Sequence, residues 1–418
     1  MKAALKLASV LLAGMFLGTG GPVCAAPMQP YQMVRSLQRL QDQIANGDHA
    51  ALPMQQKLLS IIDGRIVKAQ PEDFSDPRNL QALLIYGLSG GNPRTLQVLF
   101  SRLQLDETQT RLGEAIISYT FGDYNGARAI LREIDPKSLP PEVGAPVALV
   151  TATVTARENP YFATRMLDEA RLLSPGTLIE EAALRRSIPL AATMKDTQRL
   201  TRAAEQYVRR FLSSPYATQF VDTFVAAVVE LHDTVDLSMV DEVTAQMSDE
   251  QARIVYLRLA RKSAIEGYDR LIAFASQKAM SFGKEEDPRA VLYASMASVS
   301  SDNVDDVLQA LKGIDRNRLS DADRELLDAA RAVAEAVLDE PRHTAALPEP
   351  RLEDDAGIPD PALPEPAEST AADQVSNSEI PQATPGLSFP DDAADSYLQE
   401  MRSKLRDIDA LLEKENVQ

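Results

Sequence analysis

One spacing of four residues recurs along the middle of this chain: a first residue, called position 0, and the residues 4, 7 and 12 positions after it. We call this spacing the frame. Positions 0, 4 and 7 of the frame lie on one face of a helix, and a proline at position 12 ends that helix. Small residues on the shared face let a neighbouring helix approach closely. The frame therefore predicts an all-α fold, a degenerate tetratricopeptide-like helical-repeat solenoid built from stacked helix pairs. The first copy consists of Ala163, Leu167, Ala170 and Pro175.

Two further copies lie on either side of the first. A looser one lies 36 residues upstream, where Gly122-Asp123-Tyr124 leads into Ala127, Leu131 and Ile134. The other follows 40 residues downstream and consists of Ala203, Tyr207, Arg210 and Pro215. The unequal spacing of 36 and 40 residues indicates degenerate repeats, so a regular superhelix is not expected.

The composition suits closely packed helices and limits the partners. Hydrophobic residues make up 44% of the chain and aromatic ones only 5%, with no Trp, so the core must consist mainly of Ala, Leu, Val and Ile. The net charge is −18 overall and −20 without residues 1–25, which contain Lys2 and Lys6 but no acid. Such a chain repels nucleic acid and anionic membrane surfaces. We therefore expect no nucleic acid and a partner that is neutral or basic where it touches.

Residues 1–25 are typical of a secretory signal peptide. Lys2 and Lys6 precede an apolar run from Leu7 to Leu17, and small residues allow cleavage after Ala25. The run is too short to span a bilayer, so we expect no retained membrane segment. The alternative is lipidation of Cys24, which the preceding Gly-Pro-Val disfavours. Cleavage would deliver the mature protein to an oxidising compartment without its cysteine and therefore without any disulfide.

The remaining chain divides into three parts. Residues 26–340 form a helical-repeat domain with on the order of fifteen helices, because apolar residues recur at spacings of three and four. Residues 341–390 hold 10 of the 26 prolines and a net charge of −7, which predicts a disordered Pro-rich acidic linker. Residues 391–418 form a C-terminal amphipathic helix that docks on the body, pairs with a copy of itself or binds a partner. Its apolar seam consists of Leu398, Met401, Leu405, Ile408 and Leu412.

Local signals mark several helix boundaries. Asn46-Gly47 ends a first helix, and a later helix runs to Gly90-Gly91 before Asn92-Pro93 opens the next. We interpret the glycine pair as a plain turn, the alternative being a backbone cradle for an anion. Two pairs have the spacing of capping boxes, Ser248 with Gln251 and Ser320 with Asp323.

The search for catalytic, cofactor-binding or metal-binding residues is negative. The three histidines lie far apart in the sequence, and no two of them have the short spacing that lets neighbouring histidines bind one metal ion. Only His232 lies in an apolar helix, where a histidine at the edge of the core is a better account than a catalytic base. Asp302, Asp305 and Asp306 lack the glycine and glutamate of a calcium loop and resemble helix-capping acids. No nucleophile has a plausible base, so the sequence indicates no enzyme.

Three stretches carry a likeness to a known family. They are Pro30-Tyr31-Gln32-Met33-Val34-Arg35-Ser36-Leu37-Gln38, Leu84-Ile85-Tyr86-Gly87-Leu88-Ser89-Gly90-Gly91-Asn92-Pro93 and Gly122-Asp123-Tyr124-Asn125-Gly126-Ala127. These motifs resemble the MotC family of periplasmic motility proteins of alphaproteobacteria, and the likeness runs through most of the helical body. The resemblance implies a periplasmic accessory of the flagellar motor that associates with the periplasmic part of the stator protein MotB and is needed for rotation. It offers no catalytic residues to carry over.

A stacked helical body presents a concave face in which a segment of a stator subunit can lie. Aromatic residues and Arg dominate interface hot spots, so they are the candidates for this face. For the tyrosines the alternative is a role as core fillers. The candidates for lining or bordering the face are Tyr124, Tyr161, Arg165, Tyr207 and Arg210.

Two other classes of function remain as alternatives. A periplasmic chaperone or assembly scaffold would use a helical-repeat groove to bind many clients. A helical-toroid lyase or hydrolase acting on polysaccharide is also built from repeated helix pairs. Its sugar sites need Trp and Tyr platforms with a placed acid and base, and this chain has no Trp.

Overall fold

The computed structural model describes residues 28–282, 287–297 and 303–339. Three predicted parts lie outside these residues: the signal peptide 1–25, the acidic linker 341–390 and the C-terminal helix 391–418. The apolar seam from Leu398 to Leu412 is therefore not described, and its role stays a prediction.

The described residues are all-helical, as the sequence predicts, and they contain no strand. The first helices are α1 (Pro30–Ala45), α2 (Ala51–Ile66), α3 (Pro77–Leu88), α4 (Pro93–Phe100), α5 (Glu107–Thr120), α6 (Tyr124–Leu131) and α7 (Pro141–Thr155). They are followed by α8 (Pro160–Leu173), α9 (Leu178–Thr193), α10 (Thr197–Phe211), α11 (Ala217–Glu230) and α12 (Leu237–Thr244). The last are α13 (Asp249–Glu266), α14 (Asp269–Ser281), α15 (Pro288–Met296), α16 (Val304–Gly313) and α17 (Asp321–Asp339). Short 3-10 helices span Pro71–Ser75, Pro136–Ser138 and Arg316–Arg318.

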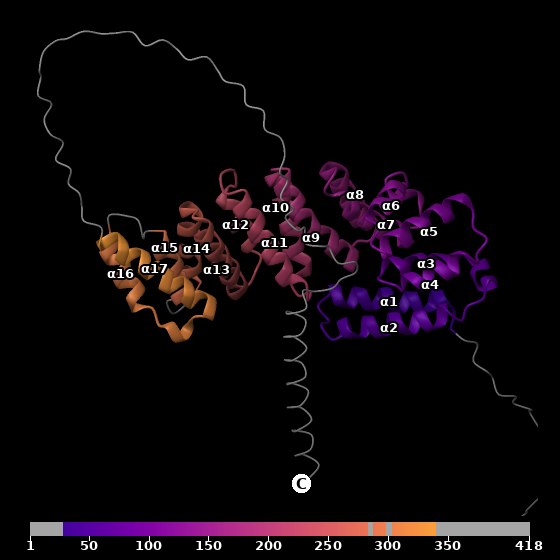
Figure 1. The fold of residues 1–418 in the computed structure, drawn as a ribbon, viewed down its shortest axis with the longest axis horizontal. Coiled ribbons are helices and arrows are strands. Elements are labelled where there is room, and N and C mark those ends of the chain that lie inside the picture. The colour runs from indigo at the N-terminus through magenta and orange to yellow at the C-terminus, as the bar shows by residue number, and fades with distance from the viewer. Residues whose placement is uncertain (1–27, 283–286, 298–302, 340–418) are drawn as a thin grey trace, which may run out of the picture.

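From α7 onward the helices alternate between two layers (Figure 1). Each odd-numbered helix from α7 to α17 packs on the next odd-numbered one. The even-numbered helices cover this row, with α8 on α7 and α9, α14 on α13 and α15, and α16 on α15 and α17. The molecule is elongated along this row (Figure 1).

The repeated frame lies on the even-numbered helices α6, α8 and α10. Ala163, Leu167 and Ala170 of α8 are buried and form a small core with alanines of α7 and α9. The small side chains of Ala163 and Ala170 allow the close approach of helices that the sequence predicts. The frame's proline follows α8 at Pro175, two residues after the last helical residue Leu173.

The helix α1 joins the two larger cores. Its first half contributes Val34 and Leu37 to the core of α2 to α7. Its second half contributes Leu40 and Ile44 to the core that extends from α9 to α17. In Figure 1, α1 and α2 lie beneath the first helices and reach toward α9, which α1 contacts. One continuous helix therefore holds both parts of the molecule in one arrangement.

The predicted local signals shape the ends of the helices. The side chain of Asn92 caps α4 by accepting a hydrogen bond from the Arg94 N–H at 3.1 Å. Gly90 adopts φ +92°, which favours glycine. Gly91 lies against the Tyr86 ring, where an added Cβ would come within 2.5 Å of a ring carbon. Ser248 and Gln251 form the predicted reciprocal capping box at the start of α13.

Four large tyrosine side chains are almost fully buried, and each hydroxyl donates to a carboxylate of another helix. Burial raises the pKa of all four tyrosines well above the usual value, so the hydroxyls stay protonated donors. We call these contacts the tyrosine–carboxylate bonds. They join Tyr86 to Asp63 (2.7 Å), Tyr207 to Glu181 (2.7 Å), Tyr256 to Asp241 (2.6 Å) and Tyr293 to Asp323 (2.8 Å).

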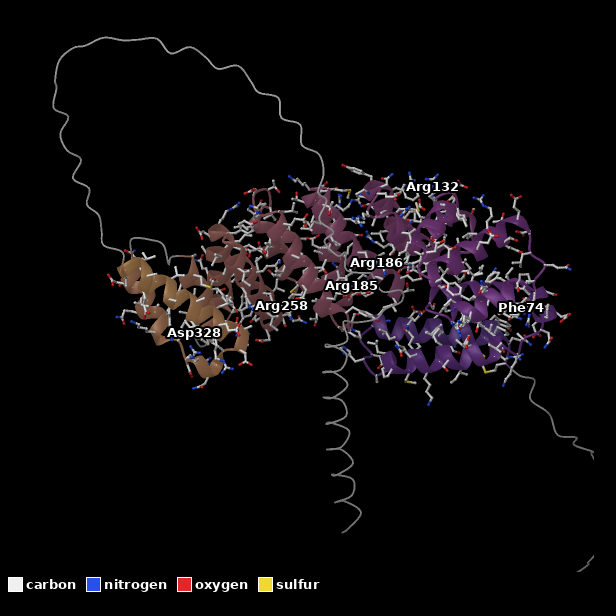
Figure 2. The ribbon with its side chains drawn as sticks, in the orientation of Figure 1. Phe74, Arg132, Arg185, Arg186, Arg258 and Asp328 are labelled. Atoms are coloured by element: carbon white, nitrogen blue, oxygen red, sulfur yellow. The ribbon has the colours of Figure 1, made fainter. Side chains whose placement is uncertain are left out.

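Each of these bonds reaches a third element of the fold. The Tyr86 hydroxyl also accepts the backbone N–H of Asn92, which precedes α4. Glu181 also accepts two hydrogen bonds from Arg185, whose guanidinium reaches Gln219 of α11 at 2.8 Å. Arg185 lies on α9 near the middle of the molecule (Figure 2). These polar contacts thus fix three elements at a time.

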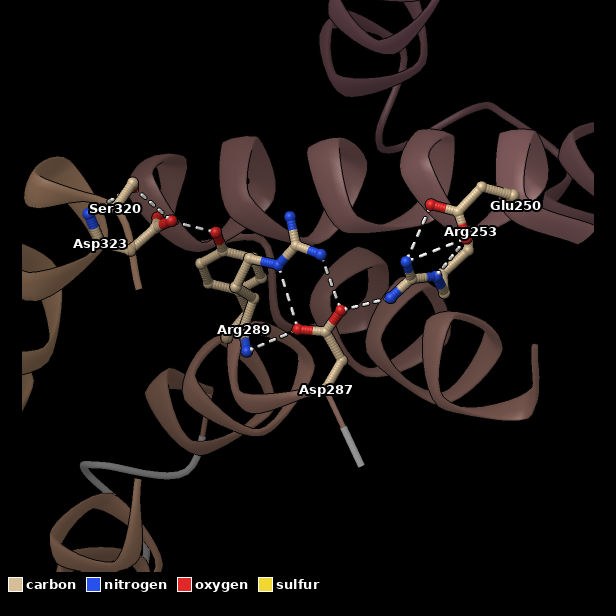
Figure 3. A network of polar contacts seen from close by, with 7 residues as sticks. Glu250, Arg253, Asp287, Arg289, Ser320 and Asp323 are labelled. Atoms are coloured by element: carbon tan, nitrogen blue, oxygen red, sulfur yellow. Dashed lines mark hydrogen bonds and ion pairs between the residues drawn. The ribbon is translucent and has the colours of Figure 1, made fainter. Parts of the chain in front are cut away.

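The last bond belongs to a network at the C-terminal end of the helical row (Figure 3). Asp323 of α17 accepts hydrogen bonds from Tyr293 of α15, from Arg261 of α13 at 3.1 Å and from Ser320 at 2.7 Å. Next to it, Asp287 caps α15 and accepts from Arg253 of α13 at 2.6 Å. The two carboxylates therefore tie α13, α15 and α17 together.

Replacing Tyr207→Phe should lower the free energy of unfolding by about 2 kcal/mol, because Glu181 is fully buried and loses a donor. Urea unfolding followed by circular dichroism measures the change. The control is Tyr161→Phe, at a side chain that is 76% exposed, which should change stability by less than about 0.5 kcal/mol. Equal stability of both variants would contradict the proposed strength of the tyrosine–carboxylate bonds.

The Asp323 network should make stability depend on acidity. Burial alone would raise the pKa of Asp323, but hydrogen bonds from Ser320, Tyr293 and Arg261 outweigh it and hold the pKa below its usual value. The folded state therefore gains stability above the unfolded pKa of about 3.9 and loses it as pH falls below that value. Asp323→Asn should cost about 2 kcal/mol at pH 6, and this difference from wild type should shrink at pH 3. A difference that stays constant in urea unfolding at both pH values would disprove the linkage.

Candidate partner-binding site

A cavity of about 540 Å³ opens between α8 and the turn that joins α9 to α10. Its walls come from two chain segments, one on α8 and one from the end of α9 to the start of α10. The lining residues are Tyr161, Thr164, Arg165, Asp168, Met194, Lys195, Asp196 and Arg199.

The start of α8 sets one wall. Asn159 caps the helix by accepting the N–H of Phe162 at 3.0 Å, and Pro160 occupies its first turn. Tyr161 and Arg165 stand four residues apart and so share one exposed helix face, while Ala163 faces the core. The Arg165 guanidinium lies over the Phe162 ring, 5.0 Å from its centroid. This contact holds the guanidinium beside the cavity.

The turn between α9 and α10 sets the other wall. Lys195 adopts φ +55°, the only positive φ of a non-glycine residue in the described part of the chain. Its N–H donates to Ala192 O at 2.8 Å, and Asp196 N–H donates to Ala191 O at 2.9 Å. These bonds close the end of α9, and Asp196 then caps α10. A left-handed conformation costs a non-glycine residue about 1–2 kcal/mol, so the turn holds Lys195 against a local preference.

The charges in the cavity do not cancel. Asp168 pairs with Arg199 at 2.8 Å and with Arg171 at 3.2 Å, and Arg199 also lies 3.6 Å from Asp196. The two acids therefore face Arg199. Arg165 and Lys195 are exposed and form no ion pair with any described residue. The cavity is thus locally cationic in a strongly acidic chain.

The structure separates the five candidates that the sequence suggests for a binding face. Tyr161 and Arg165 both line the cavity. The side chain of Tyr207 is fully buried and stacks on Phe220 with ring centroids 4.0 Å apart, which favours its alternative role as a core filler. Tyr124 is half-buried on α6, 5.8 Å from the Tyr119 ring.

Arg210 has a structural partner. It pairs with Glu180 at 2.8 Å, and the Glu180 side chain is only 7% exposed. The second carboxylate oxygen of Glu180 accepts the Gly176 N–H at 2.6 Å. The partner contacts of all five residues stay predictions, and Arg165 and Tyr161 are the two that the structure brings together.

Sequence reasoning missed Asp168, Lys195 and Arg199. Asp196 stands directly before a helical stretch, and the sequence could predict it as the cap of that helix, since Asp is a preferred capping residue. The left-handed turn at Lys195 gives no such signal, because Gly or Asn normally occupies that position. The pairing of Asp168 with Arg199 joins two helices and has no local sequence mark.

Other predicted sites take ordinary structural roles. His232 lies in the turn that follows α11 and not within a helix. It is half-buried and stacks on Tyr268 with ring centroids 3.7 Å apart, as expected for a histidine at the edge of the core. Asp305 and Asp306 lie in the first turn of α16. Within the described ranges no group of three or more His, Cys, Asp or Glu residues is placed to hold a metal ion. Nor does any helix in those ranges have the length and apolar character needed to cross a membrane.

Comparison with known proteins gives one consistent relationship. The family model described as chemotaxis protein MotC matches residues 1–417. The chemotaxis protein MotC of Rhizobium meliloti (strain 1021) is 36% identical over 429 residues, covering 98% of this chain and 97% of that protein. No solved structure matches. A match of this extent, together with the motifs that first suggested it, shows that the chain belongs to the MotC family of chemotaxis proteins.

Proposed function

We propose that this chain is a non-enzymatic periplasmic accessory protein of the flagellar motor, required for rotation, which binds the periplasmic part of the stator protein MotB. Membership of the MotC family, whose relative is named as a chemotaxis protein, carries the proposal. The signal-like residues 1–25 support delivery to the periplasm, with cleavage after Ala25.

The architecture supports a binding role. The two-layered row from α7 to α17 agrees with degenerate tetratricopeptide-like repeats, a scaffold that usually binds other proteins. We place the partner contact at the cavity between α8 and the α9–α10 turn. The cavity combines an exposed aromatic side chain, Tyr161, with a cation that has no ion-pair partner among the described residues, Arg165. This combination is typical of interface hot spots.

Deleting the gene should leave flagellar filaments in place but stop them from turning. A stator accessory acts after the filament is built, so assembly should proceed without it. Electron microscopy for filaments and tethered-cell rotation measure the two properties separately. Missing filaments would contradict the proposal and favour an assembly scaffold.

Arg165→Glu should weaken binding of a purified periplasmic MotB fragment at least tenfold, about 1.4 kcal/mol, because it reverses the charge of an exposed cation in the cavity. Helical content should stay unchanged. The matched control is Arg94→Glu on α4, an exposed arginine outside the cavity. Arg210→Glu is a poor test, since it also removes the partner of the buried Glu180 carboxylate. Binding unaffected by Arg165→Glu would refute the cavity as the contact, while a mixture of captured clients would favour a chaperone.

A further inference from the structure

The last helix of the row, α17, has an apolar face that no described residue covers. Each earlier odd-numbered helix from α7 onward packs on a following one, whereas α17 is the last helix of the described residues. It packs on α15 and α16 at the end of the row (Figure 1). The position that a further helix of the row would occupy is therefore open.

The open face carries apolar residues at the spacing of packed helices. They recur at alternating intervals of four and three residues, as in a coiled coil. Val333 is 52% exposed, Leu326 is half-buried and the three alanines are exposed. We call this set the α17 seam. It consists of Ala322, Leu326, Ala329, Val333 and Ala336.

An apolar seam is unusual on the outside of a terminal repeat. Terminal repeats of a solenoid normally carry a polar outer face, which keeps the stack soluble. Beside the seam, Val337 is also 39% exposed, whereas the charged residues Asp328 and Glu335 lie elsewhere around the helix and form ion pairs with Arg316 and Lys312. The pattern of α17 thus suits a helix that is covered along one side.

The predicted C-terminal helix has the matching seam. Its residues Leu398, Met401, Leu405, Ile408 and Leu412 recur at intervals of three, four, three and four. All five are large, whereas four of the five residues of the α17 seam are Ala or Val. Large side chains that pack against small ones fill the space between two helices without voids. Two copies of α17 would instead place small residues against small ones, which disfavours a second copy of this face as the occupant.

Charge also favours this pairing. Between Asp321 and Asp339, α17 contains six acids and two arginines, a net charge of 2 − 6 = −4. Residues 398–413 contain four basic and three acidic residues, a net charge of 4 − 3 = +1. The two segments therefore attract each other weakly, while two α17 helices repel.

The chain length between the two seams permits the contact. α17 ends at Asp339, and the C-terminal seam begins 59 residues later at Leu398. A flexible linker of this length has an end-to-end distance of about 40–45 Å, which exceeds the length of α17, about 28 Å. The linkage gives the C-terminal segment an effective concentration on the order of 1 mM at α17.

We propose that residues 398–412 dock on the α17 seam of the same molecule and add one more helix to the end of the row. The contact involves no residue of the cavity at α8, so it does not depend on the proposed function. A partner that binds the C-terminal helix through its apolar seam must first displace it from α17.

Hydrogen exchange of the purified full chain, followed by mass spectrometry, tests the proposal. Backbone amides of residues 398–412 should exchange at least tenfold more slowly than in a free peptide of residues 391–418, because a helix this short is marginal alone in water. The slow exchange should persist when the protein is diluted about tenfold, since the contact lies within one molecule.

Two substitutions should release the segment. Val333→Asp places a charge in the α17 seam at an exposed position, and Leu405→Asp disrupts the opposite seam without altering the helical body. Either should return the exchange of residues 398–412 to the rate of the corresponding free peptide. The matched control is Val98→Asp on α4, where the valine is 49% exposed and the exchange of residues 398–412 should stay slow.

Four results would overturn the proposal. Exchange as fast in the full chain as in the free peptide would leave the segment available to a partner. Slow exchange that survives Val333→Asp would place the segment elsewhere on the body, and slow exchange that is lost on dilution would identify a second copy. Equal release by Val98→Asp would show an effect that is not specific to the seam. The assay contains no MotB, so its outcome is independent of stator binding.

Discussion

The arrangement of the helices depends on buried tyrosine hydroxyls that donate to carboxylates. One cysteine in 418 residues allows no disulfide within the chain, and no Trp fills the gaps between helices. Apolar contacts between small residues allow close packing but give little directional preference. Glu181 and Asp323 are buried, and a buried carboxylate without its donors is costly, so alternative packings that break the bonds to these two acids are disfavoured. The bonds reach α2 to α4, α9 to α11, and the row α13, α15 and α17.

Much of the fold follows from local sequence patterns. The sequence predicts several helix boundaries, because each depends on residues within a few positions of one another. They include the end of α1 at Ala45, the cap of α4 at Asn92 and the capping box of α13 at Ser248. The helix count was less accurate. The described residues contain seventeen α-helices rather than about fifteen, since eight-residue helices such as α4, α6 and α12 show few turns of periodicity. Pro146 and Pro189 lie inside helices, where tertiary packing overrides their local tendency to break them.

The sequence predicts only some of the residues that line the candidate site. Residue type pointed to Tyr161 and Arg165, and their spacing placed them on one face of a helix. The same rule selected Tyr207, which is buried. Tyr207 stands at position 4 of the repeated frame, where Leu167 and Leu131 stand in the other copies, so the frame itself favours its alternative role as a core filler. Lys195 and the Asp168–Arg199 pair depend on how α8 meets the α9–α10 turn, and only the three-dimensional structure supplies that contact.

The central claim is that a motor protein contacts the cavity between α8 and the α9–α10 turn. Site-specific photo-crosslinking in living cells tests it most directly, with the photoreactive residue at position 161, which is 76% exposed, and a control at the exposed Val98 of α4. The account predicts a single crosslinked product containing the stator protein from position 161 and none from position 98. Crosslinking to the stator protein from position 98 alone, or to many unrelated proteins from position 161, would contradict it.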